Sequence, residues 1–599
     1  MEVFKFIALS GSLVSAASPN NHSYSNILSI PQAEWVALNN TVGGRLQGVR
    51  PFEIACFSRF ENRPLTPSPF NCNAVQAGYA SPTFRSPHFN AYMMPHWETC
   101  QTSHQGCLLD DTNPKNPAAF NISNDCSQGS ISPFYIDVRT ERDVQSAFAF
   151  SARTGVPLSI KNSGHDYKGR SSSRGSLSLW TFNMKSMSYN KQFVPQGCNV
   201  SYNAVTVGAG ASWQDVYAFA DAHNLTIVGG YHQTVGASGG WLMGGGHSIL
   251  SPALGLGVDR VVEIKIVTPD GQSRVANDCH NSDLFWALRG GGGGTFGVVL
   301  DLESTHKVEP QLSLQVASLS FNGTSTNLRQ FYGLAINNSV KWGSEGWGGH
   351  IQGTALIYVT PNLSLDEARE SMKPMSNFIL SQNGTIVLET LTWYPFFLKY
   401  VVAAEAAVGS LTILGSRLVP KANFDTDSGK LQLLDFMMSL VPQSLPYVPV
   451  VPPVNFNFTE GSTSVTPAWR SALWHFGFHT SWEFNSSISD IQTQYAMVHN
   501  VTKTLRELTP GSGSYFNEGD VYELDHENTF WGPNYSQLLK IKRKYDPQSL
   551  LDCWQCVGWK GSDDARYCTR QVLRIVRGHR GSKPIPKWPF VLGHRDGAT

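Results

Sequence analysis

The sequence predicts an α+β protein built from several folding units. Its 599 residues exceed what one hydrophobic core usually organises, so two or three domains are expected. Between about residues 126 and 310, short apolar strand patterns alternate with stretches of helical periodicity. Many of the 54 glycines gather in three runs within the same stretch. We therefore divide the chain into residues 1–17, 18–125, 126–310, 311–505, 506–562 and 563–599.

The unit at 126–310 opens with a strand, a helix and a second strand. The helix, expected at 141–154, carries apolar side chains at Val144, Ala147 and Phe148, one face of a 3.6-residue period. Further strands and helices are expected downstream, so that the unit alternates between the two kinds of element. The predicted strands are 134–138, 156–160, 176–180, 204–207 and 261–267, and the other predicted helices are 213–223 and 282–288.

A second α+β unit is expected at 311–505, with strands at 312–321, 353–359 and 385–394 and a helix at 365–382. Its Pro/Val-rich stretch 447–453 is interpreted as a connector, and the tail from residue 563 as loose. Five aromatic residues could line an apolar site, but core packing is the favoured interpretation. They are Trp342, Trp347, Trp393, Tyr394 and Phe396.

The N-terminus predicts a secretory route. Lys5 precedes an apolar stretch at 6–17, and a polar segment follows, which is typical of a signal peptide; a buried N-terminal helix is the alternative. Asn-x-Ser/Thr sequons recur along the chain, as in secreted glycoproteins. No other stretch reaches the roughly 20 apolar residues of a membrane span. The net charge of +0 argues against nucleic acid as a partner.

Ten cysteines are expected to form disulfides in an oxidising compartment. Residues 18–125 hold most of the early cluster and read as an irregular segment stapled by these bonds. Cys553 and Cys556 could alone form a redox or zinc pair, but the second pair of a zinc ribbon is missing. The pairing cannot be deduced from sequence.

Three glycine-rich loops indicate a dinucleotide site. They lie at 161–166, 234–248 and 290–297. Backbone N–H groups can bind a pyrophosphate without a basic cluster, and glycines let the backbone approach it closely. None of the three loops matches the Rossmann fingerprint.

His165 follows an apolar strand and stands between Gly164 and Asp166. The end of a strand presents a side chain to a ligand there, and Asp166 could orient the imidazole. No neighbouring His or Cys has the spacing of a metal site, so none is expected. A histidine in this position is otherwise a surface or core residue.

The motif around His165, residues 160–167, resembles the phosphate-binding loop of the vanillyl-alcohol oxidase flavoprotein superfamily, in its berberine-bridge-enzyme-like group. Segments 234–248 and 285–298 resemble the second and third FAD loops of that group. Segments 515–518, 534–535 and 544–547 resemble its C-terminal FAD-covering segment. The sequence pattern resembles most closely that of the fungal isoamyl-alcohol-oxidase-like branch.

This resemblance implies a two-subdomain PCMH-type FAD-binding domain at 126–310, a substrate domain with an antiparallel sheet at 311–505, and an FAD-covering segment at 506–562. It also implies that His165 forms an 8α link to FAD. The backbone of six residues would cradle the cofactor: Ser163, Gly164, Gly236, Ser238, Gly239 and Val298. The same resemblance places Asp166, Thr234, Val235, Asn517 and Asn534 around FAD.

The sequence departs from that group at two positions. His232 stands where many members carry a cysteine bonded to the flavin, so a single covalent link is expected. Asn517-Glu518 replaces the Asn-Tyr of plant-like members, so Glu518 is a candidate base, with a structural carboxylate as the alternative. Tyr515 and His232 are further candidates around the substrate. Val235 is compatible with oxygen access, although core packing explains it equally well.

The resulting hypothesis is a secreted, monomeric oxidase. A base takes a proton from a small organic molecule, hydride passes to FAD, and dioxygen reoxidises the flavin to give hydrogen peroxide. Two alternatives stay open. One is a flavin-dependent dehydrogenase or cyclisation enzyme of secondary metabolism. The other is a glycoprotein that binds flavin or sugar without turnover.

Overall fold

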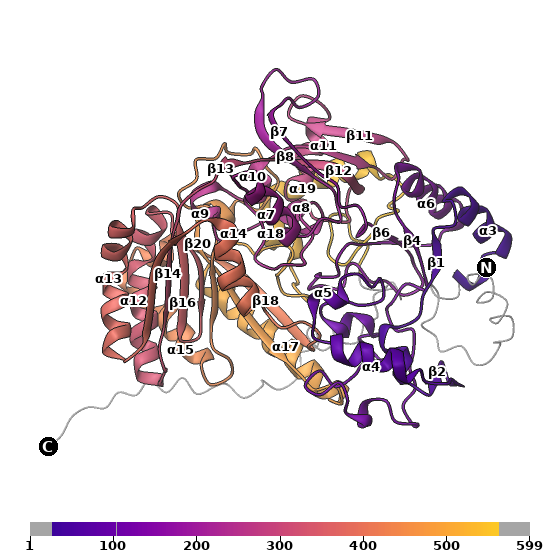
Figure 1. The fold of residues 1–599 in the computed structure, drawn as a ribbon, viewed down its shortest axis with the longest axis horizontal. Coiled ribbons are helices and arrows are strands. Elements are labelled where there is room, and N and C mark those ends of the chain that lie inside the picture. The colour runs from indigo at the N-terminus through magenta and orange to yellow at the C-terminus, as the bar shows by residue number, and fades with distance from the viewer. Residues whose placement is uncertain (1–26, 104, 562–599) are drawn as a thin grey trace.

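The computed structural model describes residues 27–103 and 105–561 (Figure 1). The predicted signal peptide at 1–17 and the tail at 563–599 lie outside the described residues. Helices and sheets are mixed, as the α+β prediction requires. Among the helices within the described residues, none is long and apolar enough to cross a membrane.

A four-stranded sheet opens the first α+β unit, in the order β1-β4-β6-β5. Strands β4 (Phe134–Asp137), β6 (Leu177–Trp180) and β5 (Leu158–Lys161) run parallel, and β1 (Leu46–Gly48) joins antiparallel. Helix α6 (Glu141–Thr154) makes the crossover between β4 and β5. Its bounds are those predicted, because the Thr140–Asp143 capping box starts it and Gly155, at φ 73°, ends it.

A five-stranded sheet follows, in the order β11-β10-β12-β8-β7. Helix α7 (Trp213–Ala222) and α11 (Ser282–Leu288) accompany it, and β10 and α11 have the predicted bounds. The Cys198–Cys279 disulfide ties the segment before β8 to the turn after β11. The strands are β7 (Met187–Phe193), β8 (Tyr202–Val207), β10 (Val261–Val267), β11 (Ser273–Asn277) and β12 (Val298–Lys307).

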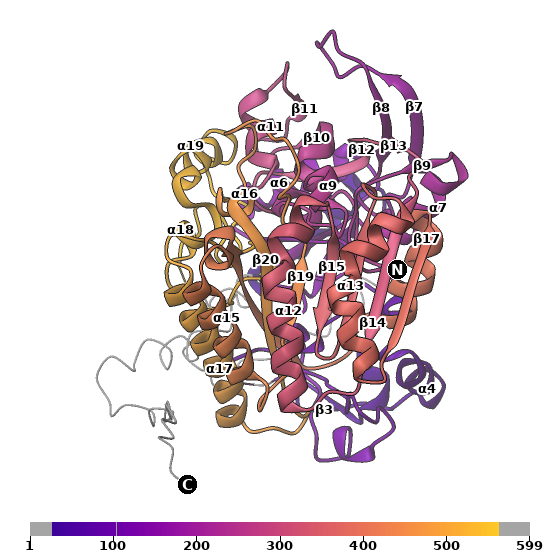
Figure 2. The same cartoon turned by 90° about the vertical axis from the view of Figure 1, so that its left-hand side faces the viewer.

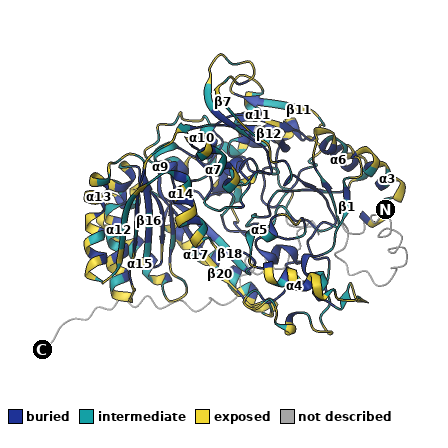
Figure 3. Ribbon diagram, viewed as in Figure 1, coloured by how far each residue is buried: buried dark blue, intermediate teal, exposed yellow. Residues whose placement is uncertain are grey.

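The second unit is a seven-stranded antiparallel sheet, in the order β17-β14-β16-β15-β19-β20-β18. Four helices cover one face, as Figure 2 shows, and their outer surfaces are exposed in Figure 3. They are α12 (Ser325–Ser344), α13 (Leu365–Ser381), α15 (Asp427–Leu440) and α17 (Ile488–Leu508). The strands are β14 (Leu314–Ser320), β15 (Gly348–Gln352), β16 (Ala355–Thr360), β17 (Thr385–Leu391), β18 (Thr412–Pro420), β19 (Tyr447–Val450) and β20 (Ala472–Ser481).

The stretch interpreted as a connector contains a strand, so that prediction was wrong. Strand β19 pairs along its whole length with β15, from Gly349↔Val450 to Gln352↔Tyr447, and bridges to β20 at Tyr447↔Gly477. Val448 and Val450 pack into the helix-covered core. Pro449 carries no N–H, which made the stretch look unfit for a sheet interior. Strand β19 accommodates this proline because it pairs fully with β15 but makes only a single bridge to β20.

The five aromatic residues considered for an apolar site divide between the two cores. Trp342 and Trp347 pack under the helices of the second unit, and both donate their indole N–H to Ser371. Trp393 and Phe396 pack with the five-stranded sheet, and Tyr394 packs partly buried against the same cluster. The core interpretation is therefore confirmed.

The N-terminal segment is less irregular than expected. It contains α3 (Gln32–Thr41) and α4 (Pro69–Gly78), and its β1 belongs to the first sheet. Two disulfides, Cys56–Cys72 and Cys107–Cys126, staple it as predicted. A fourth disulfide, Cys553–Cys556, joins the late pair, so neither of these two cysteines is a free thiol.

Candidate active site

The three glycine loops meet at one place, although up to about 130 residues separate them in sequence. Asn162 of the first loop lies beside the second, because a Cβ added at Gly236 would fall 2.7 Å from the Asn162 amide oxygen. Gly240 of the second loop lies beside the third, because a Cβ on Gly293 would fall 2.7 Å from the Gly240 Cα. Their absent side chains therefore allow three backbones to converge.

Space remains around this junction. A Cβ added at Gly240 or Gly294 meets no atom within 4 Å, and one at Gly239 meets only the Asn162 amide at 3.7 Å. The Asn162 amide oxygen is buried without a hydrogen-bond partner among the described residues. Open backbone and an unsatisfied polar atom fit a bound phosphate-containing cofactor.

The C-terminal segment holds the third loop in place. It comprises α18 (His526–Trp531), α19 (Tyr535–Tyr545) and the flanking loops. The buried Lys542 ammonium donates to the Thr295 and Leu551 carbonyls, at 2.6 and 2.7 Å, and pairs with Asp546 at 2.6 Å. The Trp531 indole N–H donates to the Gly290 carbonyl at 3.0 Å.

His165 stands at the loop junction. Its Nε2 lies 2.7 Å from the Thr234 hydroxyl, and its ring meets His232 edge-on with centroids 4.4 Å apart. Burial, then the nearby His232 and Lys161, lower the pKa of His165 well below its usual value. The imidazole is therefore neutral at physiological pH, and a neutral ring keeps a lone pair for bonding.

Asp166 does not take the orienting role expected of it. Its carboxylate accepts hydrogen bonds from the Arg170 guanidinium, at 2.8 and 3.0 Å, and from the Ser171 amide. Arg170 also donates to the Asn517 amide oxygen at 2.9 Å. The loop after His165 turns back, which directs the Asp166 carboxylate to this arginine; Thr234 is the hydrogen-bond partner of His165 instead.

His232 belongs to the His165 side of the site. Its Nδ1 lies 3.3 Å from the Glu405 carboxylate, which also accepts from the backbone and side chain of Gln233. Burial lowers the pKa of His232 to about 4. The structure thus places His232 against the candidate flavin ligand and apart from the other two predicted catalytic residues, which lie together elsewhere.

Glu518 lies at the centre of a second group, with both carboxylate oxygens facing imidazoles. Oε1 is 3.0 Å from His247 Nε2, and Oε2 is 3.7 Å from His475 Nδ1. Burial raises the pKa of Glu518, but the facing imidazoles of His247, His475 and His350, with the hydrogen bond from His247, outweigh burial and hold it below its usual value. Glu518 is therefore an ionised carboxylate in a buried site.

Tyr515 joins the same group. Its ring lies 5.0 Å from that of His247, and its hydroxyl accepts from the Asn517 amide at 2.6 Å. The Asn517 amide reaches this position because Gly244 has no side chain: an added Cβ would fall 2.4 Å from it. Burial, then the Glu518 charge, raise the pKa of Tyr515 above its usual value, so the phenol keeps its proton.

The seven-stranded sheet supplies the wall that faces Glu518. Along β20 the rings of Trp474, Phe476 and Phe478 enter the helix-covered core. Side chains alternate along a strand, so His475 points to the opposite face. By the same rule His350 of β15 and Tyr447 of β19 face this side, since their neighbours Ile351 and Val448 enter the core.

His350 is packed between two tyrosine rings. Its centroid lies 4.2 Å from Tyr231 and 5.4 Å from Tyr447. Burial lowers the pKa of His350 to about 3 and that of His475 to about 4, so both rings are neutral. The sequence analysis missed His247, His350, His475 and Tyr447. The available signals were single histidines within apolar strand patterns for His350 and His475, and the end of the second glycine loop for His247.

The remaining predicted residues contribute backbone. The Ser238 hydroxyl points into the core, toward the Val207 carbonyl and Ser304, so only its main chain can meet a cofactor. Val298 starts β12 opposite Val267, and Val235 is partly buried against the first core. The Asn534 amide donates to the Val465 carbonyl at 2.9 Å, beside the third loop. Gly164, at φ 89°, accepts from the Met93 amide.

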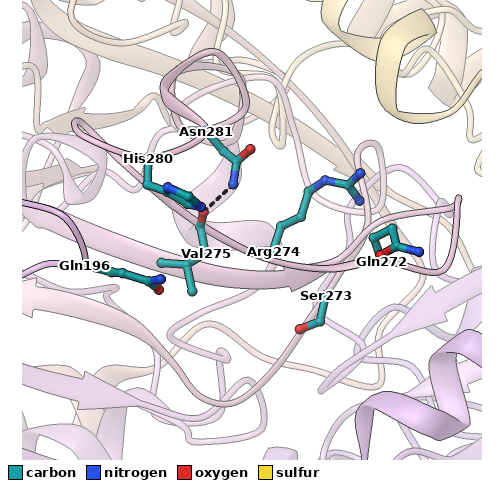
Figure 4. A pocket seen from close by; sticks show the side chains of 7 residues that line it. All are labelled: Gln196, Gln272, Ser273, Arg274, Val275, His280 and Asn281. Atoms are coloured by element: carbon teal, nitrogen blue, oxygen red, sulfur yellow. Dashed lines mark hydrogen bonds between the residues drawn. The ribbon is translucent and has the colours of Figure 1, made fainter.

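A surface pocket lies elsewhere, at the outer edge of the five-stranded sheet (Figure 4). Residues of β11 and its two turns line it, together with Gln196. None of the glycine loops and none of the residues around Glu518 contributes to it, so it is not the catalytic centre.

Two family models match the chain. One is described as an FAD binding domain and covers residues 133–277; the other, described as berberine and berberine like, covers 514–557. These segments carry the first two glycine loops and the Glu518 segment.

Curated relatives match almost the whole chain. The FAD-linked oxidoreductase ffsJ of Aspergillus flavipes is 40% identical, with 92% of this chain and 97% of the relative covered. The FAD-linked oxidoreductase OXR2 of Pyricularia oryzae is 39% identical, with coverages of 88% and 92%. The bifunctional decalin synthase calF of Penicillium decumbens is 29% identical, with coverages of 89% and 92%.

Solved structures share the fold. The VAO-type flavoprotein MtVAO615 of Myceliophthora thermophila superposes with a TM-score of 0.74 at 26% identity, covering 91% of this chain and 97% of that one. The glucooligosaccharide oxidase of Acremonium strictum, whose FAD is described as 6-S-cysteinyl, 8α-N1-histidyl, gives 0.58 at 20% identity, with coverages of 71% and 92%. The first likeness confirms the predicted fold class, and the second supports the fold alone.

Proposed function

Because the chain belongs to the FAD-linked oxidoreductases of the berberine-bridge-like flavoprotein family, we propose that it is a secreted oxidase of a small alcohol or secondary metabolite. Electrons leave to dioxygen, which gives hydrogen peroxide. The observation that carries this proposal is Glu518, a partly buried carboxylate that faces His247 and His475 in the berberine-like C-terminal segment.

FAD fits the residues around the loop junction. The backbone at Ser163, Gly164, Gly236, Ser238 and Gly239 would hold the pyrophosphate, and Asn162 offers its unsatisfied amide oxygen. When bound, oxidised FAD supplies a hydride acceptor. The protein positions the cofactor loops. Lys542 holds the third loop by a hydrogen bond, and the Asn517 amide donates to the Gly240 carbonyl at 2.9 Å, which holds the Glu518 segment against the second loop.

The covalent link is proposed as a single 8α bond to His165. The neutral ring and its Thr234 hydrogen bond suit a nucleophilic nitrogen. The second bond of glucooligosaccharide oxidase uses a cysteine. Here His232 stands beside His165, and the cysteines of the described residues are all in disulfides, so no thiol is offered there.

The proton acceptor lies in the Glu518 group. A substrate hydroxyl placed there meets an ionised carboxylate, neutral imidazoles and aromatic rings. Since Glu518 gives this group a negative charge, a neutral substrate suits it better than a carboxylate or phosphate.

Oxidative cyclisation or dehydrogenation is the second candidate. The 29% identical relative calF, described as a bifunctional decalin synthase, is the observation that favours it, since its name describes the formation of a ring system. The same FAD site and base would serve both chemistries. They differ in whether turnover releases hydrogen peroxide.

Secretion is proposed on the disulfides. Four are present in the described residues, and such bonds persist in oxidising compartments. Immunoblotting of culture medium and cell fractions from a fungal expression host tests the secretion proposal. Retention of the mature chain in the cytosol would contradict secretion.

The test of function uses purified protein and a panel of primary, aromatic and allylic alcohols. Acid denaturation comes first, and yellow colour retained on the His165 peptide is expected. Flavin bleaching under anaerobic conditions and peroxide release in air then report oxidation. Bleaching without peroxide would favour dehydrogenation or cyclisation. Protein that carries no flavin, or flavin that no compound reduces, would overturn the oxidase proposal.

A further inference from the structure

The geometry points to His247 Nδ1 as the atom that takes the substrate proton, with Glu518 as the residue that positions the His247 ring and stabilises its charged form. This assignment rests on the proposed function, because it presumes that a substrate X–H bond is deprotonated beside the flavin loops. It changes the role expected for Glu518 from base to partner of the base.

Glu518 is poorly suited to accept the proton itself. Its two oxygens already face His247 Nε2 at 3.0 Å and His475 Nδ1 at 3.7 Å. These imidazoles hold the pKa of Glu518 below its usual value despite burial. A base whose conjugate acid is that strong gives little driving force for proton transfer near neutral pH.

His247 offers an acceptor atom that no other group of the described residues occupies. Its Nε2 must carry a proton to donate to the carboxylate, so Nδ1 of the neutral ring is an acceptor. Nδ1 is buried, and among the described residues it has no hydrogen-bond partner. A buried acceptor without a partner costs free energy unless a ligand supplies the donor.

The position of His247 is fixed on several sides. The Trp241 indole N–H donates to the His247 carbonyl at 3.2 Å. The ring lies 5.0 Å from Tyr515 and 5.4 Å from His475, centroid to centroid. His247 also directly follows the glycine run of the second loop, so it connects the predicted cofactor junction with the wall of the sheet.

The other candidates in the group are weaker acceptors. His475 bonds Ser416 through Nε2, at 2.7 Å, and turns Nδ1 toward Glu518. His350 is packed between tyrosine rings, and burial lowers its pKa to about 3. The Tyr515 hydroxyl retains its proton, because burial and Glu518 raise its pKa.

The proton transfer balances within the dyad. The O–H bond of a substrate alcohol breaks, an N–H bond forms at Nδ1, and the electron pair stays on the substrate oxygen. The resulting imidazolium remains hydrogen-bonded to the Glu518 carboxylate. The pair thus passes from a net charge of −1 to zero while the substrate oxygen becomes negative, so the total charge of the site is unchanged and the Glu518 carboxylate stabilises the imidazolium.

His247, His475 and Glu518 also have a donor set that a metal ion could use, with ligand atoms within 4.8 Å of one another. The two roles exclude each other, since the hydrogen bond to Glu518 requires a proton on Nε2 and a metal would replace it. Metal analysis of the purified holoprotein decides between them. A stoichiometric transition metal that EDTA removes would overturn the dyad.

The direct test is imidazole NMR on holoprotein labelled with ¹⁵N-histidine, with the His247 signals assigned by their loss in His247→Gln. The expected wild-type state is neutral with the proton on Nε2 and a lone pair on Nδ1. Glu518→Gln should weaken the preference for this tautomer, because an amide can donate as well as accept a hydrogen bond, whereas the carboxylate only accepts. A proton on Nδ1 in the wild-type protein, or a tautomer that is unchanged in Glu518→Gln, would overturn the assignment.

Kinetics give a second readout with any alcohol from the panel that bleaches the flavin. His247→Gln should slow bleaching by about 10²-fold or more, in the range of a lost general base, while retaining covalent flavin. His280→Gln, on the outer pocket of Figure 4, is the matched control and should leave the rate unchanged. Equal rates in His247→Gln and wild type would refute the assignment. If no alcohol bleaches the flavin, the oxidase proposal fails, and the NMR result judges the dyad separately.

Discussion

Replacing Lys542 by methionine should destabilise the protein far more than the same change two residues later. Lys542 is 4% exposed, and its ammonium pairs with Asp546, whose side chain is 1% exposed. Methionine keeps the buried stem but leaves the carboxylate without its cation and two carbonyls without their donor. Breaking a buried pair typically costs 3–5 kcal/mol.

The lower end of that range applies here. The Asp546 carboxylate retains hydrogen bonds from the Leu550 and Leu551 amides, at 2.8 and 3.0 Å. We therefore expect Lys542→Met to lower the free energy of unfolding by about 3 kcal/mol. Flavin retention should fall too, because the Lys542 ammonium donates to Thr295 of the third glycine loop.

Lys544→Met is the matched control on the same helix. Its ammonium also pairs with a carboxylate, Asp283, at 2.6 Å, but the two side chains are 60% and 36% exposed. Exposed pairs contribute about 0–1 kcal/mol. Urea unfolding followed by tryptophan fluorescence measures both variants. Equal losses would refute the reasoning, and Lys542→Met/Asp546→Asn should recover part of the loss.

Three further predictions follow from other parts of the fold. Removing the Cys198–Cys279 disulfide, which has a sequence separation of 81, should lower the free energy of unfolding by about 4.5 kcal/mol through loop entropy. Removing Cys553–Cys556, with a separation of 3, should lower it by about 1.6 kcal/mol. Urea unfolding of the two double serine variants should preserve that order. Gly240→Val should reduce the flavin content seen in absorbance spectra, because the valine side chain enters space that the protein leaves open. Thermal unfolding of the flavin-free protein should be unchanged. An unchanged flavin content would place the cofactor elsewhere. The free energy of unfolding should fall as pH drops from 6.5 toward 4, since buried His232, His306 and His475 have folded pKa values of about 4. The unfolded chain binds those protons below pH 6.5 and the folded chain does not, so each group contributes up to about 1.4 kcal/mol per pH unit in that window; denaturant titrations at pH 6.5 and 4.5 that agree would contradict it.

Local sequence signals fixed much of the first unit in advance. Helix α6 begins at a capping box and ends at a left-handed glycine, so its bounds need no tertiary information. The bounds of β10 and α11 were also predicted correctly. The glycine loops and the histidine that follows the first strand pair were visible because glycine and histidine carry distinct backbone and chemical properties.

Longer-range features were not accessible in this way. Asp166 looked like the partner of its neighbour His165, but the turn of the loop directs its carboxylate to Arg170. The stretch 447–453 looked like a connector, and pairing with β15 makes part of it a strand. The first outcome depends on the turn of the loop that brings Arg170 back to Asp166, and the second on pairing with a strand about a hundred residues away.

The sequence by itself determined that the chain builds an FAD-type loop junction, with His165 at its centre and Glu518 in a closing segment. Only the tertiary structure decided which groups surround Glu518. His247 comes from a glycine loop, and His350 and His475 come from two strands. Each of the three lies more than a hundred residues from the next along the chain. Strand pairing and side-chain alternation bring them to one face, and that register depends on contacts across the whole sheet, which no local stretch of sequence encodes.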